Sequence, residues 1–192
     1  MTRFAGTSRA GHAGDGGPAT DAQLNSPTSM ALDSAGNAYI ADYYNGRLRK
    51  VSGKGVITTV AGGGGSPYPN EDGTPATSAS LSALGVAVDA AGTLYFSEQG
   101  GNRIRKVPPS GPIGTAAGNG TLGKSGDGGP ATSAQVSRPY GVAFDKTGNL
   151  YIADVVYSAI RRVTPDGIIS TFFQTSAPAA LTGLAVDSAG NL

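Results

Sequence analysis

The feature that most constrains the fold of this chain is an internal repeat. Four segments align, each ending in an aspartate: Met30-Ala-Leu-Asp33, Val86-Ala-Val-Asp89, Val142-Ala-Phe-Asp145 and Leu184-Ala-Val-Asp187. The four aspartates stand 56, 56 and 42 residues apart. A nearly fixed period of this order is typical of repeat architectures, in which each unit buries its apolar surface against its neighbours. The chain is therefore expected to be an array of similar units.

The first three units are longer because each carries an inserted segment. Gly14-Asp-Gly-Gly-Pro-Ala-Thr20 recurs as Gly126-Asp-Gly-Gly-Pro-Ala-Thr132 and, in altered form, as Glu71-Asp-Gly-Thr-Pro-Ala-Thr77. Pro18 suits the first turn of a short helix, so the insert is expected to form a cap between units. It lacks the lysine and the long helix of a phosphate-binding loop. Calcium binding by its aspartate stays open as an alternative.

Each unit divides into four short strands. In the first, large side chains such as Met30 and Leu32 alternate with alanine, so neither face is polar. A strand that is apolar on both faces must be covered on both sides, as in small sheets stacked around an axis. The turn that follows has Asp33 at its first position and Gly36 at its fourth, which fits a type I turn. The remaining strands are expected at 39–42, 47–51 and 56–60, at 95–98, 103–107 and 113–117, and at 151–154, 159–163 and 168–173. The sequence therefore predicts an all-β fold, a β-propeller segment of four-stranded antiparallel blades, three complete and a fourth truncated.

Composition agrees with a folded domain but names no ligand. The 31 glycines and 12 prolines recur at fixed positions and are interpreted as turns. With 14 basic and 13 acidic side chains the net charge is +1, so no overall field favours a polyanion. Cysteine is absent, which excludes disulfides and thiolate metal sites. No segment resembles a membrane helix or a signal peptide, and the compartment stays unknown from this chain.

Three segments resemble a known repeat family: Pro-Tyr-Gly-Val-Ala-Phe-Asp145, Gly-Asn-Leu-Tyr-Ile-Ala-Asp154 and Asn-Arg-Ile-Arg-Lys-Val107. They resemble the NHL repeat, and the resemblance covers nearly the whole chain. The insert makes these repeats similar to the longer NHL repeats of bacterial secreted and cell-surface proteins and of the teneurin propeller. The resemblance implies part of a six-bladed ring. It leaves function open, because the family includes RNA binders, adhesion modules, kinase sensor domains and lyases.

The repeat predicts how the chain is divided. We expect one partial NHL propeller over 1–192, with the end of a preceding blade at 1–13, blades at 14–62, 70–118 and 126–174, and the start of a truncated blade at 178–192. Thr2-Arg-Phe-Ala-Gly6 is similar to the end of a fourth strand, and the chain stops at the beginning of a second strand. Both ends are interpreted as cut, so the chain is expected to be a fragment of a longer protein, or to close a ring by self-association through its open blade edges.

Catalytic chemistry finds little support in the sequence. His12 is the single histidine and lies in a glycine-rich loop, so no histidine triad or histidine pair for zinc can form within one chain. The aspartates that end the four aligned segments are interpreted as turn caps in separate blades. No catalytic, cofactor or metal site is therefore predicted. The propeller lyases and lactonases that the fold resembles use axial metal ligands, so an enzyme with its ligands in further blades remains the alternative.

Basic residues concentrate on the third strand of each unit. Stacked blades could align these side chains into a basic rim beside nearby tyrosines, which would suit single-stranded RNA. The acids Asp42, Glu98 and Asp154 each stand one loop before a basic strand and are expected to pair with its arginines. In the third unit Ala159 replaces the arginine found at the equivalent positions of the first two, which argues against one identical ligand site per blade. The candidate contacts for a ligand or partner are Tyr43, Tyr44, Arg47, Arg49, Arg103, Arg105, Tyr157 and Arg161.

These observations favour a non-enzymatic interaction scaffold. We expect it to bind a protein, peptide or glycan through loops at one end of the ring, as part of a larger exported or cell-surface bacterial protein. No cofactor and no membrane span are expected. The enzyme is the second hypothesis, and RNA binding through the basic rim is the third.

Overall fold

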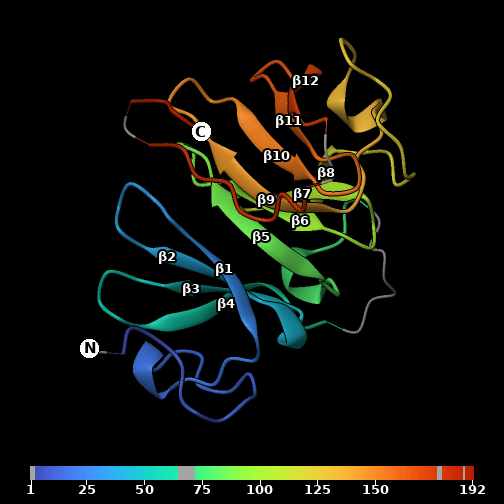
Figure 1. Ribbon diagram of the computed structural model, residues 1–192. Coiled ribbons are helices and arrows are strands. Elements are labelled where there is room, and N and C mark those ends of the chain that lie inside the picture. The colour runs from blue at the N-terminus through green and yellow to red at the C-terminus, as the bar shows by residue number, and fades with distance from the viewer. Residues whose placement is uncertain (1–2, 65–71, 177–178, 188) are drawn as a thin grey trace.

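The computed structural model describes residues 3–64, 72–176, 179–187 and 189–192, and shows three four-stranded antiparallel sheets (Figure 1). In each sheet the strands follow one another in chain order. The predicted all-β class and four-stranded blades are therefore confirmed. Thr2 and Glu71, which the sequence comparison used, lie outside the described residues.

Each sheet is one blade, numbered here in chain order. Blade 1 contains β1 (Pro27–Leu32), β2 (Ala38–Asp42), β3 (Arg47–Val51) and β4 (Ile57–Gly62). Blade 2 contains β5 (Ala83–Val88), β6 (Leu94–Glu98), β7 (Arg103–Val107) and β8 (Gly114–Ala117). Blade 3 contains β9 (Pro139–Phe144), β10 (Leu150–Asp154), β11 (Ala159–Val163) and β12 (Ile169–Gln174).

The strand limits differ slightly from those predicted. β1 begins three residues earlier, at Pro27, which lacks an N–H but is tolerated at the first position of a strand. β4 begins one residue later, at Ile57, because Val56 forms an isolated bridge with Pro18 of the insert instead. The insert thus covers part of the outer edge that β4 would otherwise expose.

The first turn of every unit is built as the sequence predicts. In blade 1 the Asp33 carboxylate accepts hydrogen bonds from the backbone N–H groups of Ala35 and Asn37, at 3.0 and 2.8 Å. The same bonds form in the fourth unit, where Asp187 accepts the N–H of Asn191 at 2.9 Å. The described residues beyond 178 contain no strand. The turn aspartates therefore serve the backbone, as expected.

The first insert precedes blade 1, and the other two lie between blades. Each contains one turn of 3-10 helix, and these are η1 (Ala19–Asp21), η3 (Ala76–Ser78) and η4 (Ala131–Ser133). The residues that follow η3, Ala79 and Leu81, share one buried cluster with Tyr39 of blade 1 and Phe96 of blade 2. The predicted caps between blades are thus present as short 3-10 turns.

The inner strands β1, β5 and β9 lie side by side and join successive blades (Figure 1). Thr28 on β1 donates its hydroxyl to the carbonyl of Leu84 on β5, at 2.7 Å. The Ser97 hydroxyl donates to the carbonyl of Tyr140 at 2.6 Å and accepts the N–H of Gly85 at 2.9 Å. Side-chain hydroxyls therefore hold neighbouring blades together at their inner edge.

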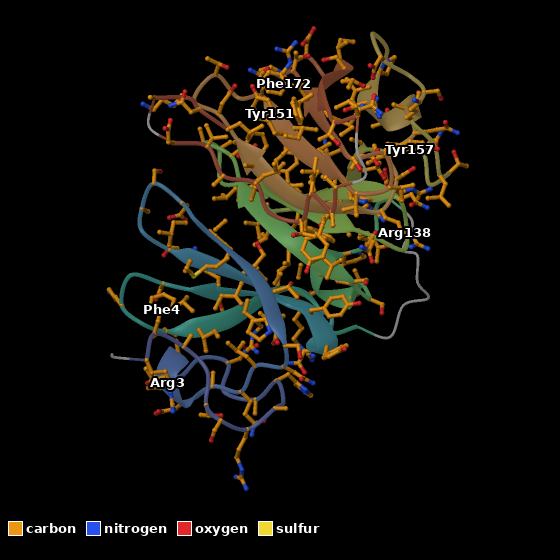
Figure 2. The ribbon with its side chains drawn as sticks, in the orientation of Figure 1. Arg3, Phe4, Arg138, Tyr151, Tyr157 and Phe172 are labelled. Atoms are coloured by element: carbon orange, nitrogen blue, oxygen red, sulfur yellow. The ribbon has the colours of Figure 1, made fainter. Side chains whose placement is uncertain are left out.

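Blade 1 leaves exposed a surface that the other blades bury. Met30 is 55% exposed, whereas its equivalents Val86 and Val142 are 4% and 6% exposed because each packs against the preceding blade. On the opposite side of the array Phe172 of blade 3 is exposed (Figure 2). Phe173, the next residue on the same strand, is also exposed. The two outer faces of the array are therefore unpartnered apolar surfaces within the described residues.

Candidate functional site

The blades have two chemically different ends. At one end lie the turns after the first and third strands, and we call this the turn end. Its segments are 33–37, 52–56, 89–93, 108–113, 145–149, 164–168, 187 and 189–191. At the other lie the loops after the second strands and the segments that lead into the first strands, at 24–26, 43–46, 80–82, 99–102, 136–138 and 155–158. We call these six segments the loop face.

Charge separates the two ends. The turn-end segments carry Asp33, Asp89, Asp145, Asp166 and Asp187 together with Lys54 and Lys146. The loop face contains no acid, and its one charged residue is Arg138. Its composition is rich in tyrosine, asparagine, glutamine, serine and glycine, which are residues that supply stacking area and adaptable hydrogen bonds in binding loops.

Two of the predicted contact residues form a pair on blade 1. Tyr43 and Tyr44 lie in the 3-10 turn η2 (Tyr43–Asn45), with ring centroids 5.1 Å apart. The Tyr44 N–H donates to the Asn25 carbonyl at 3.1 Å, which fixes the turn to the segment before β1. The Tyr44 ring is 70% exposed. The turn therefore holds the two rings close together at the surface, and as contacts for a ligand Tyr43 and Tyr44 stay predictions.

Tyr157 lies on the equivalent loop of blade 3, two blades away from the Tyr43–Tyr44 pair (Figure 2). Its ring is half-buried, and the ammonium group of Lys124 stands 5.6 Å from the ring centroid. Val156 beside it is exposed. The loop face therefore carries aromatic side chains at both ends of the array.

The central arginines of the third strands are buried, and this corrects their prediction as ligand contacts. Arg49, Arg105 and Arg161 are each 0% exposed. Arg49 reaches Asp42 at 3.3 Å and Asp15 of the insert at 2.7 Å. Since charges buried in a protein need partners, these arginines join the insert to the sheet and cannot contribute to a basic rim.

The same arrangement recurs in the other two blades with one variation. Arg105 pairs with Glu98 at 3.4 Å and with Asp72 at 2.9 Å. In blade 3 Arg161 pairs with the insert aspartate, Asp127. Asp154, the expected partner of Arg161, instead accepts the backbone N–H of Ser137 at 3.0 Å. Pairing within the blade was thus predicted correctly for Asp42 and Glu98, whereas the insert aspartates were missed.

The first arginines of the third strands are half-buried. A Cβ on Gly63 would lie 2.6 Å from the guanidinium carbon of Arg47, and one on Gly120 would lie 2.9 Å from a guanidinium nitrogen of Arg103. Both arginines therefore pack flat against the glycine backbone that leads to the next blade. Arg103 also lines an open cleft of about 550 Å³ with Asn119. As contacts for a partner, Arg47 and Arg103 stay predictions.

Burial and pairing shift the pKa values of three carboxyl groups in different directions. Burial raises the pKa of Glu98, and the Arg105 guanidinium opposes this only in part. Burial likewise raises the pKa of Asp154. Burial alone would raise the pKa of Asp127, but hydrogen bonds from Thr171 and Arg161 outweigh it and lower the pKa. Each carboxylate contacts a partner that the fold itself supplies.

The described residues contain no group of three His, Cys, Asp or Glu side chains placed to hold a metal ion. His12 lies exposed in its loop. Over the same described ranges, no helix is long and apolar enough to cross a membrane.

Most of the chain matches the model of a known repeat family. Residues 7–69 and 119–191 match the model of the teneurin NHL domain. The chain belongs to the teneurin NHL domain family. It is similar to mouse (Mus musculus) Teneurin-4, with 26% identity over 179 residues, and to zebrafish (Danio rerio) Teneurin-3, with 30% identity over 174 residues. These alignments cover 86% and 81% of this chain but 6% of each relative, so the NHL chain spans a small part of their length.

Solved structures agree with the propeller fold of this NHL chain. Virginiamycin B lyase from Staphylococcus aureus superposes with a TM-score of 0.62 at 18% identity, over 91% of this chain and 51% of the lyase. A gluconolactonase from Xanthomonas campestris superposes with a TM-score of 0.56 at 13% identity, over 80% of this chain and 48% of that chain. At such identities the likeness shows the fold alone.

Proposed function

We propose that this NHL segment is a non-enzymatic interaction module that binds a protein, peptide or glycan through the loop face. The observation that carries the proposal is the chemical contrast between the two ends of the blades. The loop face has no acid and presents Tyr43, Tyr44, Val156 and Tyr157, whereas the turn end is charged and the aspartates after the first strands are held by their own turns.

Differences between the repeats support the same surface. The residues that build the blades recur, the turn aspartates in all four units and the buried arginines in all three blades. The loops after the second strands do not recur, and read Tyr-Tyr-Asn-Gly, Gln-Gly-Gly-Asn and Val-Val-Tyr-Ser in turn. A loop that the fold does not constrain can vary to suit a partner.

Binding of RNA through a basic rim ranks below this proposal. Burial of Arg49, Arg105 and Arg161 removes three of the cations on which that hypothesis depended. The enzyme hypothesis draws on the likeness to a lyase and a lactonase, which concerns the fold alone. For the whole parent protein we propose an exported, extracytoplasmic location, in keeping with the repeat type.

A peptide-display selection tests the proposal. Peptides are selected against the purified chain, and their affinity is then measured for two variants. The loop-face variant combines Tyr44→Ser with Val156→Ser. The control variant carries Val56→Ser at the turn end. All three side chains are exposed, so neither variant should perturb the core. We expect the loop-face variant alone to lose binding, by roughly tenfold or more. Equal binding by both variants, or catalytic turnover by the pure chain, would contradict the proposal.

A further inference from the structure

We propose that an acidic segment of a protein partner is recognised by a cluster of Arg138 and Tyr157 of the loop face together with Lys124, which lies beside that face in the segment between blades 2 and 3. This inference rests on the proposed function and assigns it a partner chemistry. Lys124 and Arg138 are both exposed, and Figure 2 shows Arg138 and Tyr157 on the same side of the molecule.

The Ser137 side chain joins the segment that contains Lys124 to the segment that contains Arg138. The Gly123 N–H donates to the Ser137 hydroxyl at 2.7 Å, and that hydroxyl donates to the Gly123 carbonyl at 2.9 Å. Lys124 and Arg138 follow these two residues in the chain, so their backbones start from neighbouring points on the surface. Lys124 in turn holds its ammonium group 5.6 Å from the centre of the Tyr157 ring.

The neighbouring blade fixes Arg138 as well. Its N–H donates to the Asn102 side-chain oxygen at 3.1 Å, across the joint between blades 2 and 3. The backbone of Arg138 has a φ of 49°, in the left-handed region that a non-glycine residue seldom adopts. The chain therefore holds this arginine on the surface in a defined backbone conformation.

The cations of the cluster are not part of the repeated framework. The first and third units align at an offset of 112 residues, judged by their Gly14 and Gly126 inserts. At that offset His12 stands where Lys124 does, and Ser26 stands where Arg138 does. Ser26 has the same positive φ as Arg138, at 51°, so the backbone geometry is structural but the arginine side chain is not. A role outside the fold explains why cations occupy these two positions.

Within the described residues neither cation has an acidic partner. The nearby acids are already engaged, since Asp127 pairs with Arg161 and Asp154 is buried and accepts the Ser137 N–H. Both cations are exposed, and the exposed apolar residue Leu122 stands two positions before Lys124 in the chain. This surface is complementary in charge to a partner segment that carries closely spaced Asp or Glu residues.

The cluster fits an acidic peptide better than a nucleic acid. The whole chain has a net charge of +1, and the arginines that might have extended the patch along the third strands are buried. Nucleic acid binding draws on many phosphate contacts along a continuous basic track. A local pair of cations suits a short run of carboxylates.

The probe is a fluorescein-labelled peptide that alternates Glu with Ser, and its control is the same peptide with Gln in place of Glu. Binding is followed by fluorescence anisotropy with the full chain, at low and at physiological ionic strength. We expect the Glu peptide to bind and the Gln peptide not to bind. Lys124→Gln with Arg138→Gln should weaken binding by about tenfold.

A matched variant controls for net charge. Lys54→Gln with Lys146→Gln removes the same charge from the turn end and should leave the affinity unchanged. Equal losses in the two double variants, absence of binding at low ionic strength, or a preference for single-stranded RNA over the Glu peptide would each overturn the inference. The Glu peptide could show no binding while display-selected ligands still lose affinity on substitution of Tyr44 and Val156. That result would contradict this inference and leave the proposed function supported.

Discussion

The guanidinium group of Arg49 lies 2.7 Å from a carboxylate oxygen of Asp15, which stands 34 residues earlier in the chain. Arg49 is buried on the third strand of its blade, and Asp15 belongs to the insert that precedes the first strand. The contact therefore ties each insert to the sheet that it covers. Its recurrence at Arg105 and Arg161 makes it a structural element of the repeat.

Removal of the buried arginine should destabilise the chain strongly. Arg49→Met leaves Asp42 buried without its cation, and we expect it to lower the free energy of unfolding by about 3–5 kcal/mol. Asp15→Ala should cost less, about 1–2 kcal/mol, because Asp15 is half exposed. Urea denaturation measures both, with the exposed Arg9→Met as the control. Adding Asp42→Asn to Arg49→Met should restore part of the lost free energy of unfolding, because the buried charge is then removed. A further loss of stability in the double variant would contradict the role assigned to the pair.

Stability should fall on acidification because of the turn aspartates. Burial by itself would raise the pKa of Asp145, but hydrogen bonds from Asn149 and Thr147 outweigh it and lower the pKa from 3.8 to about 2. A carboxyl whose pKa is lower in the folded state stabilises that state above pH 3.8, and this contribution is lost as the pH falls towards 2. The urea midpoint should decline over this range, and more shallowly in Asp145→Asn.

A methyl group on Gly85 should disrupt the joint between blades. A Cβ at this position would lie 2.2 Å from the carbonyl oxygen of Tyr140 on the neighbouring inner strand. Gly85→Ala must therefore push β5 and β9 apart, and we expect a loss of about 1–3 kcal/mol. Gly53→Ala is the control, since nothing lies within 4 Å of its Cβ. Thermal unfolding should separate the two variants, and equal midpoints would show that the inner strands are not held this closely.

The exposed outer faces predict self-association. Met30 and Leu32 are 55% and 62% exposed on blade 1, although their equivalents in the other blades pack against a neighbour. Burial of such a face against another sheet is favourable, so the purified chain should have a solution mass above that of one chain. Met30→Ser with Leu32→Ser should lower the mass measured by light scattering. An unchanged mass in this variant would place the contact elsewhere.

Much of the fold follows from local sequence. The alternation around Met30 and its equivalents indicates strands that are covered on both faces, and the Asp33 and Gly36 spacing indicates the turn. Both signals act over a few residues, and the repetition of each in every unit removes most of the ambiguity of a single match.

The buried arginines could not be placed in the same way. Arg47 and Arg49 are both charged and alternate along one strand, a pattern typical of a solvated face, yet only Arg49 is enclosed. Its enclosure depends on an insert that folds back from a distant part of the chain. A signal did exist, because every unit with an insert aspartate also has an arginine at the third position of its third strand.

Hydrogen exchange with a display-selected ligand bound tests the central claim most directly. The account predicts that the ligand slows exchange in the loop-face segments, above all at 43–46 and 155–158, and leaves the turns at 33–37 and 145–149 unchanged. Protection confined to the turn end, with the loop face exchanging as in the unbound chain, would contradict the assignment of the binding surface.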